Sequence, residues 1–178
     1  DFAWFADKRW HVLKGEVELP NSKKKVTTWS MFTDAEADLW SNSIEYINDA
    51  IYYYSLWNGD YQYNQMTAVD GALSAGGGME YPNITVIGGS GNALALESVI
   101  MHETGHQWFY GMLGSNERDH AWMDEGLNTA NEIRYLEKKY PEATLLGSKK
   151  PSKKVEILDL NRPMLERYYV GYNLCARR

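Results

Sequence analysis

The sequence has little of several features that would assign it to a specialised class of protein. Its one cysteine, Cys175, cannot form an internal disulfide. A formal charge of -6 leaves no excess of basic residues to neutralise phosphates, which argues against nucleic acid as a partner. No run approaches the ~20 apolar residues of a membrane helix, and residues 1–10 lack the basic-then-apolar pattern of a signal peptide. The cellular compartment therefore stays open.

What is present is a globular composition over 178 residues, 44% of them hydrophobic, which is enough for one domain with a core. Segments rich in β-branched and aromatic residues predict four strands, at 10–19, 26–33, 61–69 and 84–87. Apolar residues at helical spacing predict a helix from Asp34 to about Tyr54, with Thr33 as its cap. These elements form a β-rich part that extends over about residues 1–90.

The remainder of the chain, about residues 91–178, is predicted to be helical. One helix is expected over 94–113, and a second from Met123 or Asp124 to Tyr140. Residues 157–178 are also expected to be helical. We expect residues 1–178 to form a single domain, cut out of a longer protein because both ends fall inside segments that look structured.

The segment His102-Glu103-Thr104-Gly105-His106 fits the His-Glu-x-x-His pattern of zinc enzymes. On a helix, two histidines four residues apart project from nearly the same face, so both imidazoles can reach one ion. Glu103 lies beside that face, where a general base can act on a water molecule. Two such histidines can also be ordinary helix residues. The apolar helix around Glu103 favours catalysis, because a buried glutamate is costly without a charged partner.

A third ligand is needed, and Glu125 is the strongest candidate, with 18 residues between it and His106. That interval is long enough to end one helix, turn and return antiparallel. Asp124 is the neighbouring alternative, but it should point about 100° away around the second helix. Glu132 shares the face of Glu125 and could accept the second N–H of a ligand histidine. The sequence therefore predicts one zinc ion per chain, held by His102, His106 and Glu125.

These residues resemble the gluzincin aminopeptidases, the aminopeptidase N family, in which His-Glu-x-x-His is followed by 18 residues and then Glu. That family also carries a Gly-x-Met-Glu-Asn segment on a strand at the edge of its cleft, matched here by Gly77-Gly78-Met79-Glu80. The resemblance covers about residues 1–140. It implies an α+β fold: a thermolysin-like metallopeptidase catalytic domain, with a small mixed β-sheet packed on the zinc-binding helix and further helices.

The resemblance also implies an activity, the removal of N-terminal amino acids from peptides by a zinc-activated water, with Glu103 as general base. It assigns Glu80 to binding the free α-amino group of the substrate; the competing interpretation is that Gly76 to Gly78 is only a turn and Glu80 a surface acid. The backbone at Gly77 and Gly78 could pair with an extended peptide. Tyr81 stands where the family has Asn, so this subsite is expected to differ in shape.

Other parts of the family's pattern have no match in this sequence. The tyrosine that stabilises the oxyanion in the family lies farther downstream than Tyr168, Tyr169 or Tyr172. The flanking β-rich and helical domains of family members are also expected to be missing. Two alternatives to an aminopeptidase stay open: a related zinc endopeptidase, and an inactive truncated core that binds zinc and peptide without turnover.

Overall fold

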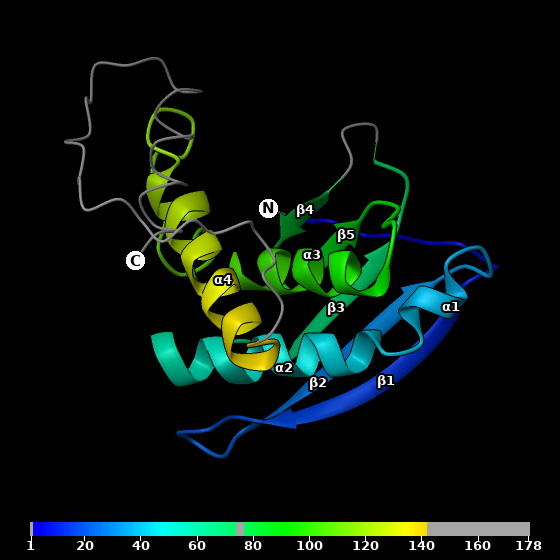
Figure 1. Ribbon diagram of the computed structural model, residues 1–178, viewed down its shortest axis with the longest axis horizontal. Coiled ribbons are helices and arrows are strands. Elements are labelled where there is room, and N and C mark those ends of the chain that lie inside the picture. The colour runs from blue at the N-terminus through cyan, green and yellow to red at the C-terminus, as the bar shows by residue number, and fades with distance from the viewer. Residues whose placement is uncertain (1, 74–76, 142–178) are drawn as a thin grey trace.

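The computed structural model describes residues 2–73 and 77–141, and the helix predicted over 157–178 lies outside them. A five-stranded mixed sheet, in the order β1-β2-β3-β5-β4, carries its helices on one face (Figure 1). The strand pairs β1–β2 and β4–β5 are antiparallel, whereas β2–β3 and β3–β5 are parallel. The α+β class is thus confirmed. The strands are β1 (His11–Glu18), β2 (Lys25–Phe32), β3 (Gln65–Asp70), β4 (Gly78–Tyr81) and β5 (Ile84–Ile87).

Three of the four predicted strands lie where expected, as β1, β2 and β5. The third, predicted to begin at Tyr61, begins instead at Gln65 as β3. Tyr61 belongs to the loop before it, where its backbone N–H donates to Ser55 Oγ at 3.1 Å and its hydroxyl to the Gln65 carbonyl at 3.0 Å. The short strand β4 follows a glycine run, and four residues are too few to show the alternation of a strand.

The predicted helix from Asp34 to Tyr54 is two helices, α1 (Ala37–Trp40) and α2 (Ser43–Asn58). The break at residues 41 and 42 lets two neighbouring segments bury different side chains. Trp40 stacks on Phe32 with ring centroids 6.0 Å apart, while the Ser43 hydroxyl lies 2.6 Å from that of Ser30 in β2. Helix α2 then continues past Tyr54, because its apolar face keeps contact with the core until Gly59 ends it at a φ of 97°.

Helix α3 (Ala93–Gly105) is capped by Asn92, whose side chain accepts from the Ala95 N–H at 2.9 Å. The prediction that it continues to Leu113 is wrong. Side chains just beyond Gly105 bind distant segments: Gln107 donates to the Tyr81 carbonyl at 2.9 Å, and the Trp108 indole donates to the Gly59 carbonyl at 2.8 Å. A straight helix could not direct both groups to these partners, so the chain turns after His106.

The second predicted helix lies in its expected range, but it consists of a π-helix followed by an α-helix. Residues Trp122–Leu127 form the π-helix η1, which leads directly into α4 (Asn128–Lys139). A π-helix adds a residue to the turn and rotates the side chains that precede it relative to those that follow. Asp124 and Glu125 both lie in this widened turn. No helix within residues 2–73 and 77–141 is long and apolar enough to cross a membrane.

An ionic cluster around the buried Glu97 fixes α4 against α2 and α3. The Lys139 ammonium lies 2.8 Å from Asp49 of α2 and 2.8 Å from Glu97 of α3, which is almost fully buried. The Tyr140 hydroxyl donates to the other oxygen of Glu97 at 2.6 Å. Moving α4 away would leave the buried Glu97 carboxylate without its charged partner, which is energetically costly. The cluster therefore holds α4 in place on α3. The position of α4 in turn places Glu132 beside the His-Glu-x-x-His segment.

Gly105 lets α3 pack closely on two other elements. A Cβ atom added there would lie 2.0 Å from Asn128 Oδ1 and 2.4 Å from the Tyr54 ring. We expect Gly105→Ala to lower the free energy of unfolding by about 1–3 kcal/mol, because the core must shift to accept the methyl group. Urea unfolding would measure the change. Gly114→Ala is the control, since no atom lies within 4 Å of a Cβ there. Equal stabilities of the two variants would contradict the packing argument.

Candidate metal centre

Three side chains from two helical segments meet at one point beside β4. His102 and His106 come from the C-terminal end of α3, and Glu125 comes from η1. The Nε2 atoms of the two histidines are 3.1 Å apart. Glu125 Oε2 is 3.1 Å from Nε2 of His102 and 3.8 Å from Nε2 of His106. The structure thus brings together the three residues that the sequence proposed as ligands.

The spacing and chemistry of these three atoms suit zinc. A tetrahedral zinc ion with ligands at ~2.0–2.1 Å has its ligand atoms about 3.3–3.4 Å from one another. The three measured separations, 3.1, 3.1 and 3.8 Å, bracket that value. Two imidazole nitrogens and one carboxylate oxygen are the donor set of a catalytic rather than a structural zinc site, because a fourth position stays available.

Each histidine is held from behind through its other ring nitrogen. His102 Nδ1 lies 3.1 Å from Glu132 Oε2, and His106 Nδ1 lies 2.7 Å from Asp124 Oδ1. Carboxylates at this position fix the ring orientation and leave Nε2 to face the ion. Glu132 is the partner that the sequence proposed. Asp124 does not compete with Glu125 for the ion side of His106, but contacts the opposite edge of its ring.

The charges of this cluster shift the pKa of each of the three predicted ligands. Burial opposes protonation of His102, but the carboxylates of Glu125 and Glu132 outweigh it and raise the pKa of His102 well above its ordinary value. His106 follows the same pattern: burial is outweighed by Asp124, and the pKa of His106 is raised. Burial acts to raise the pKa of Glu125, yet the hydrogen bond from His102 and the charge of His106 lower it on balance.

Glu103 lies on the cleft side of α3, next to the ligands but not among them. Its side chain is buried, and Oε2 has no hydrogen-bond partner within the described residues. Burial raises the pKa of Glu103 to about 7 against the opposing charges of His102 and His106. A buried carboxylate with an unsatisfied oxygen and a pKa near neutrality suits a group that accepts and returns a proton.

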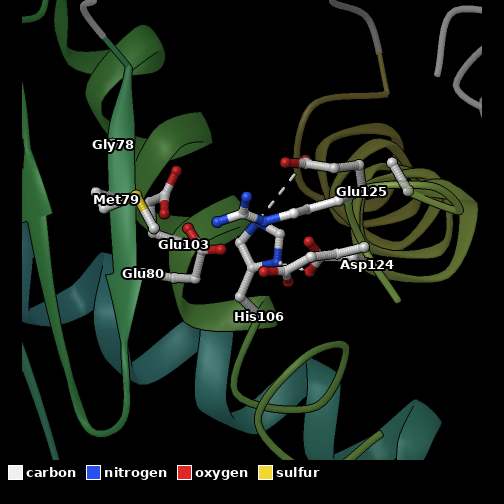
Figure 2. A pocket seen from close by; sticks show the side chains of 10 residues that line it. Gly78, Met79, Glu80, Glu103, His106, Asp124 and Glu125 are labelled. Carbon is white, nitrogen blue, oxygen red and sulfur yellow. Dashed lines mark hydrogen bonds and ion pairs between the residues drawn. The ribbon is translucent and has the colours of Figure 1, made fainter. Parts of the chain in front are cut away.

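Strand β4 forms the facing wall of a cleft of about 410 Å³, which Figure 2 shows with Glu80 and Glu103 directed toward His106. A Cβ atom on Gly78 would lie 2.4 Å from Glu103 Cγ, so glycine lets the strand approach the carboxylate closely. Gly77 precedes it at a φ of 70°. Burial raises the pKa of Glu80 despite the opposing charge of His106. Met79 also lines the cleft.

Two supporting residues were missed in the sequence. Asn128 donates from Nδ2 to the His102 carbonyl at 2.8 Å and accepts from the Tyr54 hydroxyl at 2.6 Å, which ties α4 to the end of α3. The Ser98 hydroxyl contacts Glu132 and so helps to orient it. Ser98 lies one turn before His102, a spacing that could have indicated it. Nothing local marks Asn128, because its partners are 26 and 74 residues away.

A comparison with protein-family models matches residues 40–165 to the domain of peptidase family M1. The chain belongs to peptidase family M1. Residues 40–165 make up more than two thirds of its length and contain His102, Glu103, His106 and Glu125. Among curated proteins, no sequence matches this M1 chain.

Solved structures resemble the M1 chain in fold. An aminopeptidase A from Legionella pneumophila, solved with aspartic acid, matches 72% of this chain and 16% of its own, with a TM-score of 0.63 and 14% identity. An M1 zinc metallopeptidase from Deinococcus radiodurans matches 72% of this chain and 29% of its own, with a TM-score of 0.53 and 19% identity. This M1 chain therefore spans less than a third of the length of these proteins.

Proposed function

We propose that this chain is the zinc centre of an M1 metallopeptidase, in a thermolysin-like catalytic domain that removes N-terminal amino acids from peptides. One observation carries the proposal: His102, His106 and Glu125 converge at distances suited to one ion, beside the buried and partly unsatisfied carboxylate of Glu103. The similar structures support the choice of metal, since the one from Deinococcus radiodurans is named a zinc metallopeptidase.

One zinc ion per chain would be held by His102, His106 and Glu125. When bound, zinc supplies Lewis acidity, which lowers the pKa of a water molecule toward ~7 and polarises a carbonyl group. Glu132 and Asp124 hold the imidazoles correctly turned, because each accepts the Nδ1–H and leaves Nε2 directed toward the ion.

Glu103 is the group that moves the proton. With a pKa raised to about 7, its carboxylate is a stronger base than an exposed glutamate and can accept a proton from the attacking water. The same carboxyl group then donates that proton to the departing amine as the peptide bond breaks. The base therefore returns to its starting state within one cycle.

Strand β4 positions the substrate. It ends the described sheet, so its outer edge offers backbone groups to an extended peptide, and Gly77 and Gly78 keep that edge clear of side chains. Glu80 extends from the same strand into the cleft, where its carboxylate would pair with the free α-amino group. An anchor for the amine selects chain ends over interior bonds, because an internal peptide nitrogen carries no charge.

Glu80→Gln tests the exopeptidase assignment. We expect kcat/KM on aminoacyl reporters with a free amine to fall about 10–100-fold, because a charge-assisted hydrogen bond of ~1.5–3 kcal/mol is lost. Steady-state kinetics would measure it, with Glu137→Gln on the exposed face of α4 as control. Unchanged hydrolysis by Glu80→Gln, or cleavage of N-acetylated peptides, would favour an endopeptidase. One zinc per chain without any cleavage, although Glu103 is intact, would indicate an inactive core.

A further inference from the structure

The cleft is strongly acidic, with one arginine on its wall. Five of the residues that line it are carboxylic acids, from β4, α3, η1 and the segment before η1, and Arg118 is the one lysine or arginine among them. Two of the acids are engaged by histidines, since Asp124 contacts His106 and Glu125 contacts His102. Away from the metal centre, Arg118 is therefore the one charged side chain of the cleft lining that attracts an anionic group.

Arg118 itself has no ion pair or hydrogen bond with another residue in the described part of the chain, and its side chain is exposed. Its backbone is nonetheless held in place. Asn116 Nδ2 donates to Asp119 Oδ2 at 2.8 Å, and the His120 N–H donates to the Asn116 carbonyl at 2.8 Å, so a braced turn surrounds residue 118. A guanidinium group on a fixed backbone is thus presented to the cleft without a partner.

We propose that Arg118 is a specificity-determining residue that recognises a carboxylate group of the substrate. This inference rests on the function proposed above. The planar guanidinium offers paired N–H donors that match a carboxylate in two parallel hydrogen bonds. The carboxylate has two possible sources: the side chain of an N-terminal Asp or Glu, and the C-terminal carboxylate of a short peptide. In either position, Arg118 is the one arginine or lysine of the cleft lining that such a carboxylate can meet.

Binding measured in a Glu103→Gln background separates the two sources without requiring turnover. Calorimetric titration of the zinc-loaded protein would compare Asp-Ala-amide with Asn-Ala-amide, and Ala-Ala with Ala-Ala-amide. Each pair differs by one carboxylate. We expect Arg118→Gln to lower the affinity ratio of one pair about fivefold, the change produced by ~1 kcal/mol at the upper end of exposed ion pairs. Arg134→Gln is the control, because Arg134 packs on Trp57 in α2, outside the cleft.

A change confined to the Asp/Asn pair identifies the first side chain as the ligand, and a change confined to the second pair identifies the C-terminal carboxylate. Either result supports the inference. The inference is overturned if Arg118→Gln leaves both affinity ratios unchanged, or if Arg134→Gln changes them by the same factor. Failure of the proposed function would be seen in a different measurement. In that case the zinc-loaded protein with Glu103 intact would hydrolyse no peptide, independently of the affinity ratios measured in the Glu103→Gln background.

Discussion

Replacing Glu103 with glutamine should lower kcat by about 10²–10⁴-fold, the usual contribution of a general acid–base group. Glutamine has nearly the same shape, so it should fit beneath Gly78 without moving β4. It cannot accept a proton from water, nor return one to the leaving amine. Steady-state kinetics on an aminoacyl reporter, with zinc content measured on the same samples, would check the result.

Zinc content is the control for this variant. Glu103 is not one of the three converging ligands, so Glu103→Gln should retain about one zinc ion per chain. If Glu103→Gln loses its zinc ion, the loss of activity is explained by loss of the metal and says nothing about proton transfer. A variant that keeps full activity would show that another group serves as the base.

Glu125→Ala should weaken zinc binding about 10²–10³-fold, because ~10–16 kcal/mol of zinc affinity divided over four ligands assigns about 2.5–4 kcal/mol to each. Glu132→Gln should have a smaller effect of about 10–100-fold, since it removes a hydrogen-bonding partner of His102 and leaves the ligands intact. Competition with a chelator of known affinity would measure both.

The order of these two effects is itself the test. If Glu132→Gln costs as much affinity as Glu125→Ala, Glu132 contacts the ion directly and the assignment of the ligands changes. Glu137→Gln, an exposed position on the same helix, should leave zinc affinity unaltered. The free energy of unfolding should be measured for each variant without zinc, so that loss of the fold is not mistaken for loss of the site.

Much of the site was predictable because its information is local. His102, Glu103 and His106 lie within one turn of a helix, and the periodicity of a helix alone decides that two of them face the same way. Glu132 follows Glu125 by seven residues, so they were expected to share a face, and the structure has both of them in contact with His102. The spacing between His106 and Glu125 needed only a turn and an antiparallel return.

Other features had no local signal. The end of α3 at Gly105 depends on the contacts of Gln107 with β4 and of Trp108 with Gly59, which are 26 and 49 residues away. The widened turn at η1 brings Asp124 to His106 Nδ1, whereas the geometry of a regular helix led us to expect Asp124 to point elsewhere. Neither contact could be inferred from residue types in a window of sequence.

The sequence by itself determined which chemical groups are available and how those within a single helix are arranged, because backbone hydrogen bonds set that arrangement regardless of the surroundings. Only the tertiary structure decided how close β4 lies to Glu103, which carboxylate supports each histidine, and that Arg118 lines the acidic cleft. The physical reason is that burial and charge pairing act between segments far apart in the chain, and these set the environment in which each group titrates and binds.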